Sequence, residues 1–211
     1  MDWHEDLNYF IRYPGKQLPP ASAVDEKCVV RCNQTHSDHV RVVGLCEAGK
    51  VVEDCDALIT AEKNLYLVIK TADCVPVTII DERRGVVANV HAGWRGTAAK
   101  IVEKTLLRMS EEFACIPSEL KAIIGPCIGP CCFEVGDEVV EAIGLQFVSG
   151  RSVNDKPMLD LRGANLSQLK LFGIQEDNIV VSNECTCCSD SLPSYRRCKT
   201  IDRIETFVRN A

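Results

Sequence analysis

Residues 75–96 read VPVTIIDERRGVVANVHAGWRG, in which the charged segment from Asp81 to Arg84 separates two runs rich in β-branched residues. This pattern predicts two strands joined by a turn. The second run ends at His91, and two glycines then flank Trp94 and Arg95. A turn of small residues between a strand and a helix lets side chains and backbone N–H groups converge on a ligand. His91 is therefore a candidate for a functional site, and the alternative is a histidine that only caps the strand.

The rest of the chain predicts strands and helices around this hairpin. Apolar residues take up helical spacing from Thr97 onward, which predicts a long amphipathic helix. Two more helices are predicted for residues 136–144 and 159–173, the second closed by Gly173. The other predicted strands are residues 28–32, 39–43, 57–60, 65–70, 120–125 and 178–182. The sum is a mixed α and β fold.

Length and composition limit the class of protein. The 211 residues suit one hydrophobic core, so we expect a single domain over residues 1–211, with an extended, poorly patterned leader over residues 1–27. A net charge of −6 argues against nucleic acid as a partner. No apolar run suits a signal peptide or a membrane span. We therefore expect a cytoplasmic protein that does not bind a membrane.

Thirteen cysteines are an unusually large number for such a chain. In a reducing compartment most of them are expected to be small buried hydrophobes, ligands or nucleophiles. Two groups stand out, Cys127/Cys131/Cys132 and Cys185/Cys187/Cys188. A second zinc ion or a redox pair is conceivable here, but only Cys185 and Cys188 have CxxC spacing, so the pattern by itself does not favour a second site.

Two further residues have side chains that suit a metal site with His91. Cys74 follows the strand at residues 65–70, and the hairpin can return His91 beside it. His36 lies in a polar stretch, NQTHSDH, between two predicted strands. Two imidazoles and one thiolate suit zinc or copper, and three protein ligands leave the open position that catalytic zinc sites keep.

The sequence resembles a known family, the YfiH family, which is also called the multicopper polyphenol oxidase (laccase) domain family. Its motifs recur in the family's order between Asn33 and Arg197. The matching segments are TADCVPV (71–77), NVHAGWRGTAAKIVEKTL (89–106), IGPCIGPCCFEVGDEV (124–139), LDLRGAN (159–165) and CTCCSDSLPSYRR (185–197). Only 33 residues precede Gln34, whereas family members usually have a longer N-terminal region with a Ser-Thr-Arg-X-Gly-Gly segment.

The resemblance implies a fold, a metal and an activity. It implies an α+β fold of mixed, largely antiparallel β-sheets with helices packed on the outer faces. It implies that His36, Cys74 and His91 bind one metal ion, usually zinc, with copper as the alternative. It also implies phosphorolysis of purine nucleosides (adenosine, inosine, guanosine and methylthioadenosine), with adenosine deamination as a second activity. The expected partners are then a purine nucleoside and phosphate.

Residue types suggest which side chains contact these substrates. Phosphate needs an arginine or backbone N–H groups near the ribose. Arg95, near His91 in the sequence, is the first candidate, and Arg196 and Arg197 are the next. A Tyr-Arg-Arg run is as often part of a solvent-exposed face as it is part of a substrate site. Asp73 is expected to orient a ligand, to act as a base or only to form a turn.

Three alternatives to the phosphorylase remain open. A copper oxidase would need an axial methionine and a separate cluster of histidines, and the chain has only three methionines and four histidines. A cysteine hydrolase would use Cys74 as nucleophile and His91 as base. A binding module would keep the metal ion and turn over nothing.

Overall fold

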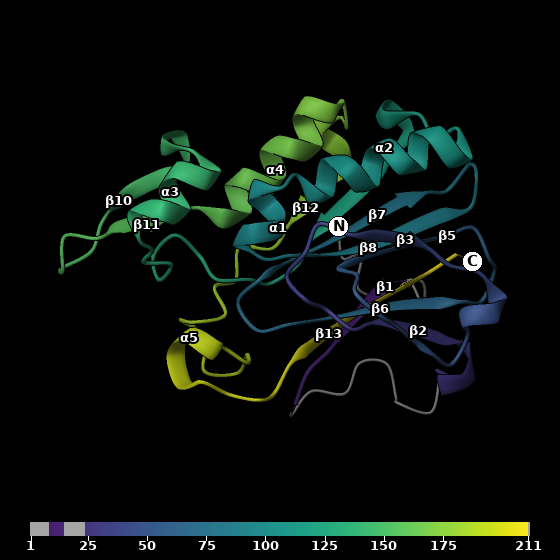
Figure 1. Ribbon diagram of the computed structural model, residues 1–211, viewed down its shortest axis with the longest axis horizontal. Coiled ribbons are helices and arrows are strands. Elements are labelled where there is room, and N and C mark those ends of the chain that lie inside the picture. The colour runs from purple at the N-terminus through teal and green to yellow at the C-terminus, as the bar shows by residue number, and fades with distance from the viewer. Residues whose placement is uncertain (1–8, 15–23, 211) are drawn as a thin grey trace.

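The predicted hairpin forms the centre of the fold in the computed structural model, which describes residues 9–14 and 24–210. Strands β7 (Val75–Asp81) and β8 (Val86–Ala92) pair antiparallel, with Pro76 opposite His91. Nearly every side chain of both strands is buried, because the hairpin lies inside a layered structure. Figure 1 shows helices on one side of it and a second sheet on the other.

Four more strands extend the hairpin into a six-stranded sheet with the order β12-β9-β7-β8-β5-β3. The outer strands are β3 (Val40–Val42), β5 (Ala57–Thr60), β9 (Lys121–Ile124) and β12 (Ile179–Val181). The pairs β5/β8, β7/β8 and β7/β9 are antiparallel, and β3/β5 and β9/β12 are parallel. The sheet is therefore mixed.

A five-stranded sheet with the order β1-β13-β6-β2-β4 packs against the inner face of the six-stranded sheet. Its strands are β1 (Tyr9–Arg12), β2 (Val29–Cys32), β4 (Val51–Val52), β6 (Tyr66–Thr71) and β13 (Ile204–Arg209). Leu58, Leu67 and Val87 fill the space between the sheets. Buried Asn89 also joins the sheets, since its amide donates hydrogen bonds to the carbonyls of Leu67 and Thr206.

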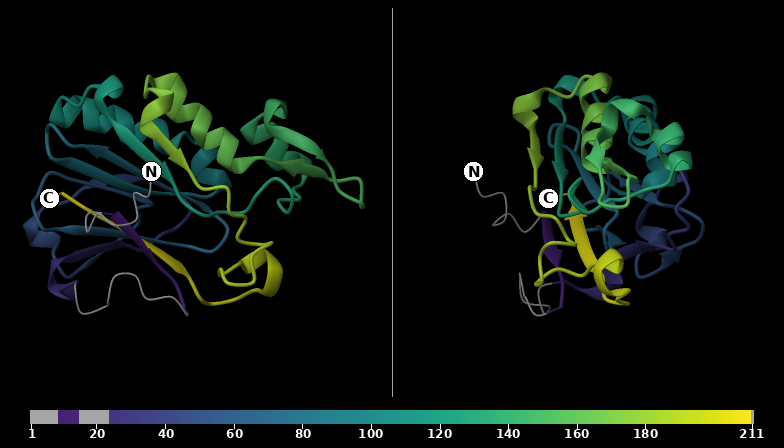
Figure 2. Two further views of the ribbon diagram at one scale, coloured as in Figure 1. Left: turned by 180° about the vertical axis from the view of Figure 1, so that it is seen from behind. Right: turned by 90° about the vertical axis from the view of Figure 1, so that its left-hand side faces the viewer.

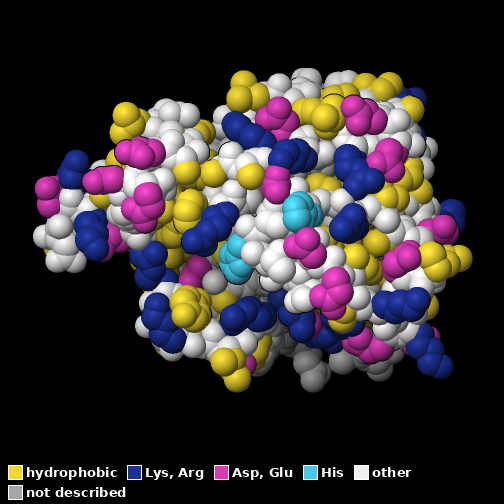
Figure 3. Space-filling view, in the orientation of Figure 1, with side chains coloured by type: hydrophobic (Ala, Val, Ile, Leu, Met, Phe, Trp, Pro, Cys, Tyr) yellow, Lys and Arg dark blue, Asp and Glu magenta, His cyan; other side chains and the backbone are white. Residues whose placement is uncertain are grey.

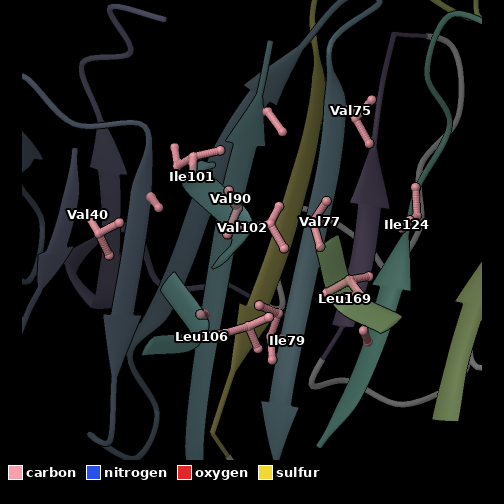
Figure 4. Close-up of a cluster of buried hydrophobic side chains, with 14 of the residues drawn as sticks. Val40, Val75, Val77, Ile79, Val90, Ile101, Val102, Leu106, Ile124 and Leu169 are labelled. Carbon is pink, nitrogen blue, oxygen red and sulfur yellow. The ribbon is translucent and has the colours of Figure 1, made fainter. Parts of the chain in front are cut away.

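Helices cover the outer face of the six-stranded sheet (Figure 2). They are α1 (Trp94–Ala98), α2 (Ile101–Phe113), α3 (Asp137–Ile143) and α4 (Leu161–Phe172), and a short α5 (Tyr195–Cys198) lies near the C-terminus. Figure 4 shows Ile101, Leu106 and Leu169 packed on valines and isoleucines of the sheet. A ribbon of β10 (Val148–Arg151) and β11 (Pro157–Leu159) adjoins α3. Within residues 24–210, single-turn 3-10 helices occupy Glu26–Cys28, Leu45–Glu47, Pro117–Glu119, Leu145–Phe147 and Glu176–Asn178.

The expected α+β class with mixed sheets and outer helices is confirmed, and local differences have physical causes. The helix expected from Thr97 is two helices, because Lys100 adopts a left-handed backbone (φ 66°) between α1 and α2. The predicted leader includes β1, in which Tyr9 and Phe10 are buried against β13. Residues 1–8 and 15–23 of that leader lie outside the described residues.

Candidate metal centre

His91 stands at the end of β8 and is almost completely buried, with 3% of its surface exposed. Its Nδ1 lies 2.6 Å from Oδ1 of Asp56, a carboxylate with no exposed surface. Because Nδ1 donates its proton to this carboxylate, Nε2 is the nitrogen left to bind a metal ion. Asp56 therefore orients the imidazole in the way that a buried partner usually orients a metal ligand.

The same carboxylate shapes the loop that carries His36. Asp56 accepts hydrogen bonds from the backbone N–H groups of Thr35 (3.1 Å), His36 (3.1 Å) and Ser37 (2.7 Å). These bonds stabilise the left-handed backbone of His36 (φ 60°), a conformation that costs a non-glycine residue about 1 kcal/mol or more. Gln34 fixes the base of the loop by exchanging two hydrogen bonds with the backbone of Lys70. One buried acid thus positions two candidate ligands.

Cys74 completes the group from the turn between β6 and β7. One ligand atom from each of His36, Cys74 and His91 lies within 4.8 Å of the others. The two imidazole rings meet edge to face, with centroids 4.9 Å apart. At Gly93 a Cβ atom would lie 3.0 Å from Cδ2 of His36 and 3.3 Å from Sγ of Cys74, so only glycine leaves this cluster undisturbed.

The charges of the cluster favour a cation. Burial raises the pKa of the Cys74 thiol, but the charge of His91 and hydrogen bonds from both imidazoles offset this and lower it to about 6. Burial lowers the pKa of His91, but Cys74 and Asp56 together raise it to about 9. Burial likewise raises the pKa of Asp56, and hydrogen bonds from His91 and Ser37 bring it down to about 2. Positive charge is therefore stabilised between a thiolate and a carboxylate.

This donor set fits a single zinc or copper ion. Imidazole nitrogen and thiolate sulfur are the ligands that these borderline-soft ions prefer, and three protein ligands leave a position for water or substrate. The structure thus brings together the three residues that the sequence suggested as ligands, from a loop, a turn and a strand end that are far apart in the chain.

A cavity of about 530 Å³ opens from these three side chains. Figure 3 shows histidine side chains exposed on this face, with lysine and arginine side chains around them. The cavity lining includes three cationic side chains, those of Lys70, Arg196 and Arg203. It also includes two aromatic side chains, Phe133 and Tyr195. The volume falls within the usual range for small-molecule sites, about 300–1,000 Å³.

The other residues suggested by the sequence take different places. Asp73 lines the cavity, but its carboxylate accepts hydrogen bonds from the Thr186 hydroxyl (2.6 Å) and the Arg196 backbone N–H (2.6 Å), so it holds the C-terminal segment in place. Arg196 lines the cavity and donates to the carbonyls of Cys132 and Glu134.

Arg95 and Arg197 do not line the cavity. Arg95 is exposed and stacks on the ring of Trp94, with its guanidinium carbon 4.3 Å from the ring centroid. Arg197 donates to the carbonyls of Thr186 and Leu192 and to others of the same loop, which identifies it as a loop-bracing residue.

Sequence reasoning missed Asp56, Lys70, Phe133, Tyr195 and Arg203. Asp56 precedes the predicted strand at residues 57–60, and a buried strand preceded by two acids (Asp54 and Asp56) was the only available signal. Lys70 and Arg203 read as ordinary charged residues at strand ends. Their place in the cavity lining depends on which strands become neighbours, because β13 pairs with β6 in the middle of the five-stranded sheet.

Comparison with known proteins places the chain among related sequences. The family described as multi-copper polyphenol oxidoreductase laccase matches residues 15–209. A purine nucleoside phosphorylase of Bacteroides thetaiotaomicron is 38% identical over 178 residues, covering 78% of this chain and 66% of that protein. An adenosine deaminase, RL5, from an unknown prokaryotic organism is 36% identical over 78% of this chain and 68% of its own length. A purine nucleoside phosphorylase of Aquifex aeolicus is 34% identical over 97% of this chain and 93% of its own length.

Solved structures agree with this grouping. The YfiH protein of Bacillus licheniformis matches with a TM-score of 0.83 and 30% identity over 89% of this chain and 76% of that one. YlmD from Geobacillus stearothermophilus matches with a TM-score of 0.82 and 31% identity over 89% of this chain and 75% of that one. The chain therefore spans about two thirds of the Bacteroides relative and about three quarters of these two structures. Among the helices that the structure describes, none has the length and apolar character needed to cross a bilayer.

Proposed function

The chain belongs to the multi-copper polyphenol oxidoreductase laccase family, and we propose that it is a zinc-dependent purine nucleoside phosphorylase. The proposed substrates are adenosine, inosine, guanosine and methylthioadenosine, with phosphate as the second substrate. The names of three relatives that are 34–38% identical support this activity class. No disulfide joins any of the thirteen cysteines, which supports a reducing, cytoplasmic setting.

One observation carries the proposal: three candidate metal ligands, cationic side chains and aromatic rings line the same cavity. His36, Cys74 and His91 are the residues that would hold the zinc ion. When bound, zinc would supply Lewis-acid polarisation of an oxygen atom in the cavity. Asp56 keeps His91 in the ligating orientation, and Gly93 leaves room for all three ligands.

Phosphate is expected to bind the cationic part of the lining. The Lys70 ammonium is half exposed and lies 3.6 Å from Glu205, so it remains available to an anion. Arg203 uses one guanidinium nitrogen, Nη1, for the carbonyls of Thr200 and Asp202. Its second terminal nitrogen, Nη2, is suited to donate a hydrogen bond to a phosphate oxygen. The purine is expected against Phe133 and Tyr195, because bases stack on aromatic faces.

Phosphorolysis is then promoted because phosphate and nucleoside are held next to each other in the cavity. A phosphate oxygen forms a bond to the anomeric carbon of the ribose while the bond from that carbon to the purine nitrogen breaks. The electron pair of the broken bond leaves with the purine, which takes up a proton. The cations hold the phosphate and the aromatic rings orient the base, so that two substrates react as if they were one molecule. Asp73 contributes by fixing Arg196 in the cavity wall and by holding the loop that carries Thr186.

Adenosine deamination is the proposed second activity, and the relative named adenosine deaminase RL5 supports it. In this reaction water adds to C6 of the purine and ammonia leaves. The same cavity serves if the base, rather than the ribose, faces the metal-ligating triad.

The decisive experiment follows adenosine with and without phosphate in the zinc-loaded protein. Adenine is expected only when phosphate is present, and inosine is expected in both conditions. Cys74→Ala and His91→Ala are expected to lose the metal ion of this site and adenine release together. The matched control is His39→Ala, since His39 is half exposed and pairs with Asp54 outside the cavity. Adenine release without phosphate, or zinc-loaded protein with no turnover, would contradict the proposal.

The copper oxidase alternative predicts a different result. The family description names laccase, and the same donor set also suits copper. We expect slight phenol oxidation that depends on added copper. Robust oxidation by copper-free protein would contradict this expectation.

A further inference from the structure

A second cluster of sulfur atoms lies outside the cavity, on two loops that are far apart in the chain. Cys131 and Cys132 belong to the loop between β9 and α3, and Cys185 and Cys188 to the loop between β12 and α5 (Figure 1). Residues 127 and 185 pair as a parallel bridge, and the N–H of Thr186 donates to the carbonyl of Cys127 at 3.0 Å. The two loops are therefore joined through the backbone.

The four sulfur atoms form a compact group. All four lie within 4.8 Å of one another, and Sγ of Cys188 is 3.5 Å from that of Cys131 and 3.3 Å from that of Cys132. A zinc ion bound by four thiolates at about 2.3 Å needs sulfur atoms about 3.8 Å apart in a tetrahedron. A disulfide needs about 2.05 Å. The observed spacing is close to the first arrangement.

The backbone around the cluster makes room for an ion. The Gly129 N–H donates to Sγ of Cys185 at 3.2 Å, a bond that favours a thiolate. A Cβ atom at residue 129 would lie 3.2 Å from Sγ of Cys131 and 3.4 Å from Sγ of Cys185. On the other loop, the N–H of Ser189 donates to the carbonyl of Cys185, a turn that places Cys185 and Cys188 on one side. Both loops thus direct two thiols toward a common point.

Three arginines bond with the backbone of these two loops. Arg196 donates to the Cys132 carbonyl, Arg197 to the Cys187 carbonyl and Arg162 to the Glu184 carbonyl. A tetrathiolate zinc centre has a net charge of −2, and three guanidinium groups from α4 and α5, bonded to carbonyls of these loops, offset part of it. The neighbouring Cys127 is buried and bonds with Arg162, so it stays outside the cluster.

We propose that Cys131, Cys132, Cys185 and Cys188 bind a second metal ion, a structural zinc. Four protein ligands leave no open position, so this site is closed in the way that structural zinc sites are. Its position gives it a role in the cavity wall. Phe133 follows Cys132 directly and lines the cavity, and Thr186 follows Cys185 and bonds with Asp73. Zinc at this cluster holds the two loops together and so holds Phe133 and Asp73 in place.

The first test is the zinc content of protein purified without added chelator. Two zinc ions per chain are expected in the unchanged protein and one in Cys188→Ser, whose substituted side chain is exposed. Cys198→Ser is the matched control, because Cys198 is an exposed thiol of α5 outside the cluster, and it should keep both ions. Cys188→His should recover the second ion, since imidazole also binds zinc. Two ions in Cys188→Ser, or iron in place of zinc, would overturn the proposal.

This test is independent of the proposed activity. If the protein holds one zinc that Cys74→Ala keeps and Cys188→Ser loses, the structural site stands and the metal dependence of the phosphorylase fails. If Cys74→Ala loses the single zinc and Cys188→Ser keeps it, the structural site is wrong. Thiol counting excludes a disulfide: the unfolded, metal-free protein should titrate thirteen thiols. A count of eleven, which corresponds to one disulfide, would contradict the zinc cluster if Cys188→Ser restored the partner thiol.

Discussion

The two candidate metal sites of this molecule differ in ligand number and in support. The mixed-ligand site (His36, Cys74 and His91) has three ligands around a buried imidazole and opens into a cavity. The thiol cluster (Cys131, Cys132, Cys185 and Cys188) has four ligands on two surface loops. Three ligands leave a coordination position for chemistry, and four do not. The number of protein ligands therefore distinguishes the proposed catalytic centre from the proposed structural one.

The support of the ligands differs as well. In the mixed-ligand site, Asp56 accepts hydrogen bonds from one ligand's ring and from the loop of another. This carboxylate has no exposed surface and lies where the strands of the six-stranded sheet end. In the thiol cluster, the backbone N–H of Gly129 and two arginines of α5 that bond with loop carbonyls give the support. The first site is built into the core, whereas the second holds two loops onto it.

The largest expected effect separates the two sites directly. Cys74→Ala should lower phosphorolysis by roughly a thousandfold, because a Lewis acid contributes several kcal/mol to the transition state. The zinc of the thiol cluster should remain. Steady-state adenine release and zinc content measure both, and a variant that kept more than a tenth of the activity would break the proposed assignment.

The second effect tests the buried support of the mixed-ligand site. Asp56→Asn should lower metal affinity or activity by about 10–100-fold, since it removes the charge that orients His91. The thermal transition should also fall, because the loop at residues 35–37 loses one of its two acceptor oxygens. Asp54→Asn is the control, as Asp54 is a largely exposed acid of the same region that pairs with His39. Equal losses of affinity in both variants would show that the position of His91 does not depend on Asp56.

A third, smaller effect concerns the cavity that opens from the mixed-ligand site. Lys70→Ala should raise KM for phosphate by about tenfold, the equivalent of one charge-assisted hydrogen bond, and should leave zinc content at both sites unchanged. Lys170→Ala is the matched control, because Lys170 also pairs with a glutamate, Glu176, but far from the cavity lining. An unchanged KM for phosphate would remove Lys70 from the phosphate site.

The smallest effect on activity is expected from the thiol cluster. Cys188→Ser should lower the thermal transition by roughly 5 °C, about 1–3 kcal/mol for a chain of this length, and should lower activity by only about twofold to fivefold. The loss should appear in KM for the nucleoside, because Phe133 lies in the cavity wall that the cluster holds. A loss as large as that of Cys74→Ala would mean that the two sites do not differ in the way that their ligand numbers suggest.

Local patterns in the sequence predicted most of the fold. The β-branched runs around Asp81–Arg84 became β7 and β8, and the helix closed by Gly173 became α4. The strands β1 and β13 escaped prediction, because β1 pairs with β13 and β13 pairs with β6, and both pairings join distant parts of the chain. The single helix expected from Thr97 is interrupted at Lys100, whose left-handed backbone no periodicity of apolar residues reveals.

The sequence by itself determined the mixed α and β class, the central hairpin and the identity of three candidate ligands, because strand, turn and ligand chemistry are properties of neighbouring residues and residue types. Only the tertiary structure decided that Asp56 supports two of these ligands, that Arg95 does not line the cavity and that four cysteines on two separate loops converge. Such convergence depends on which strands pair and how loops cross, and no local pattern contains that information.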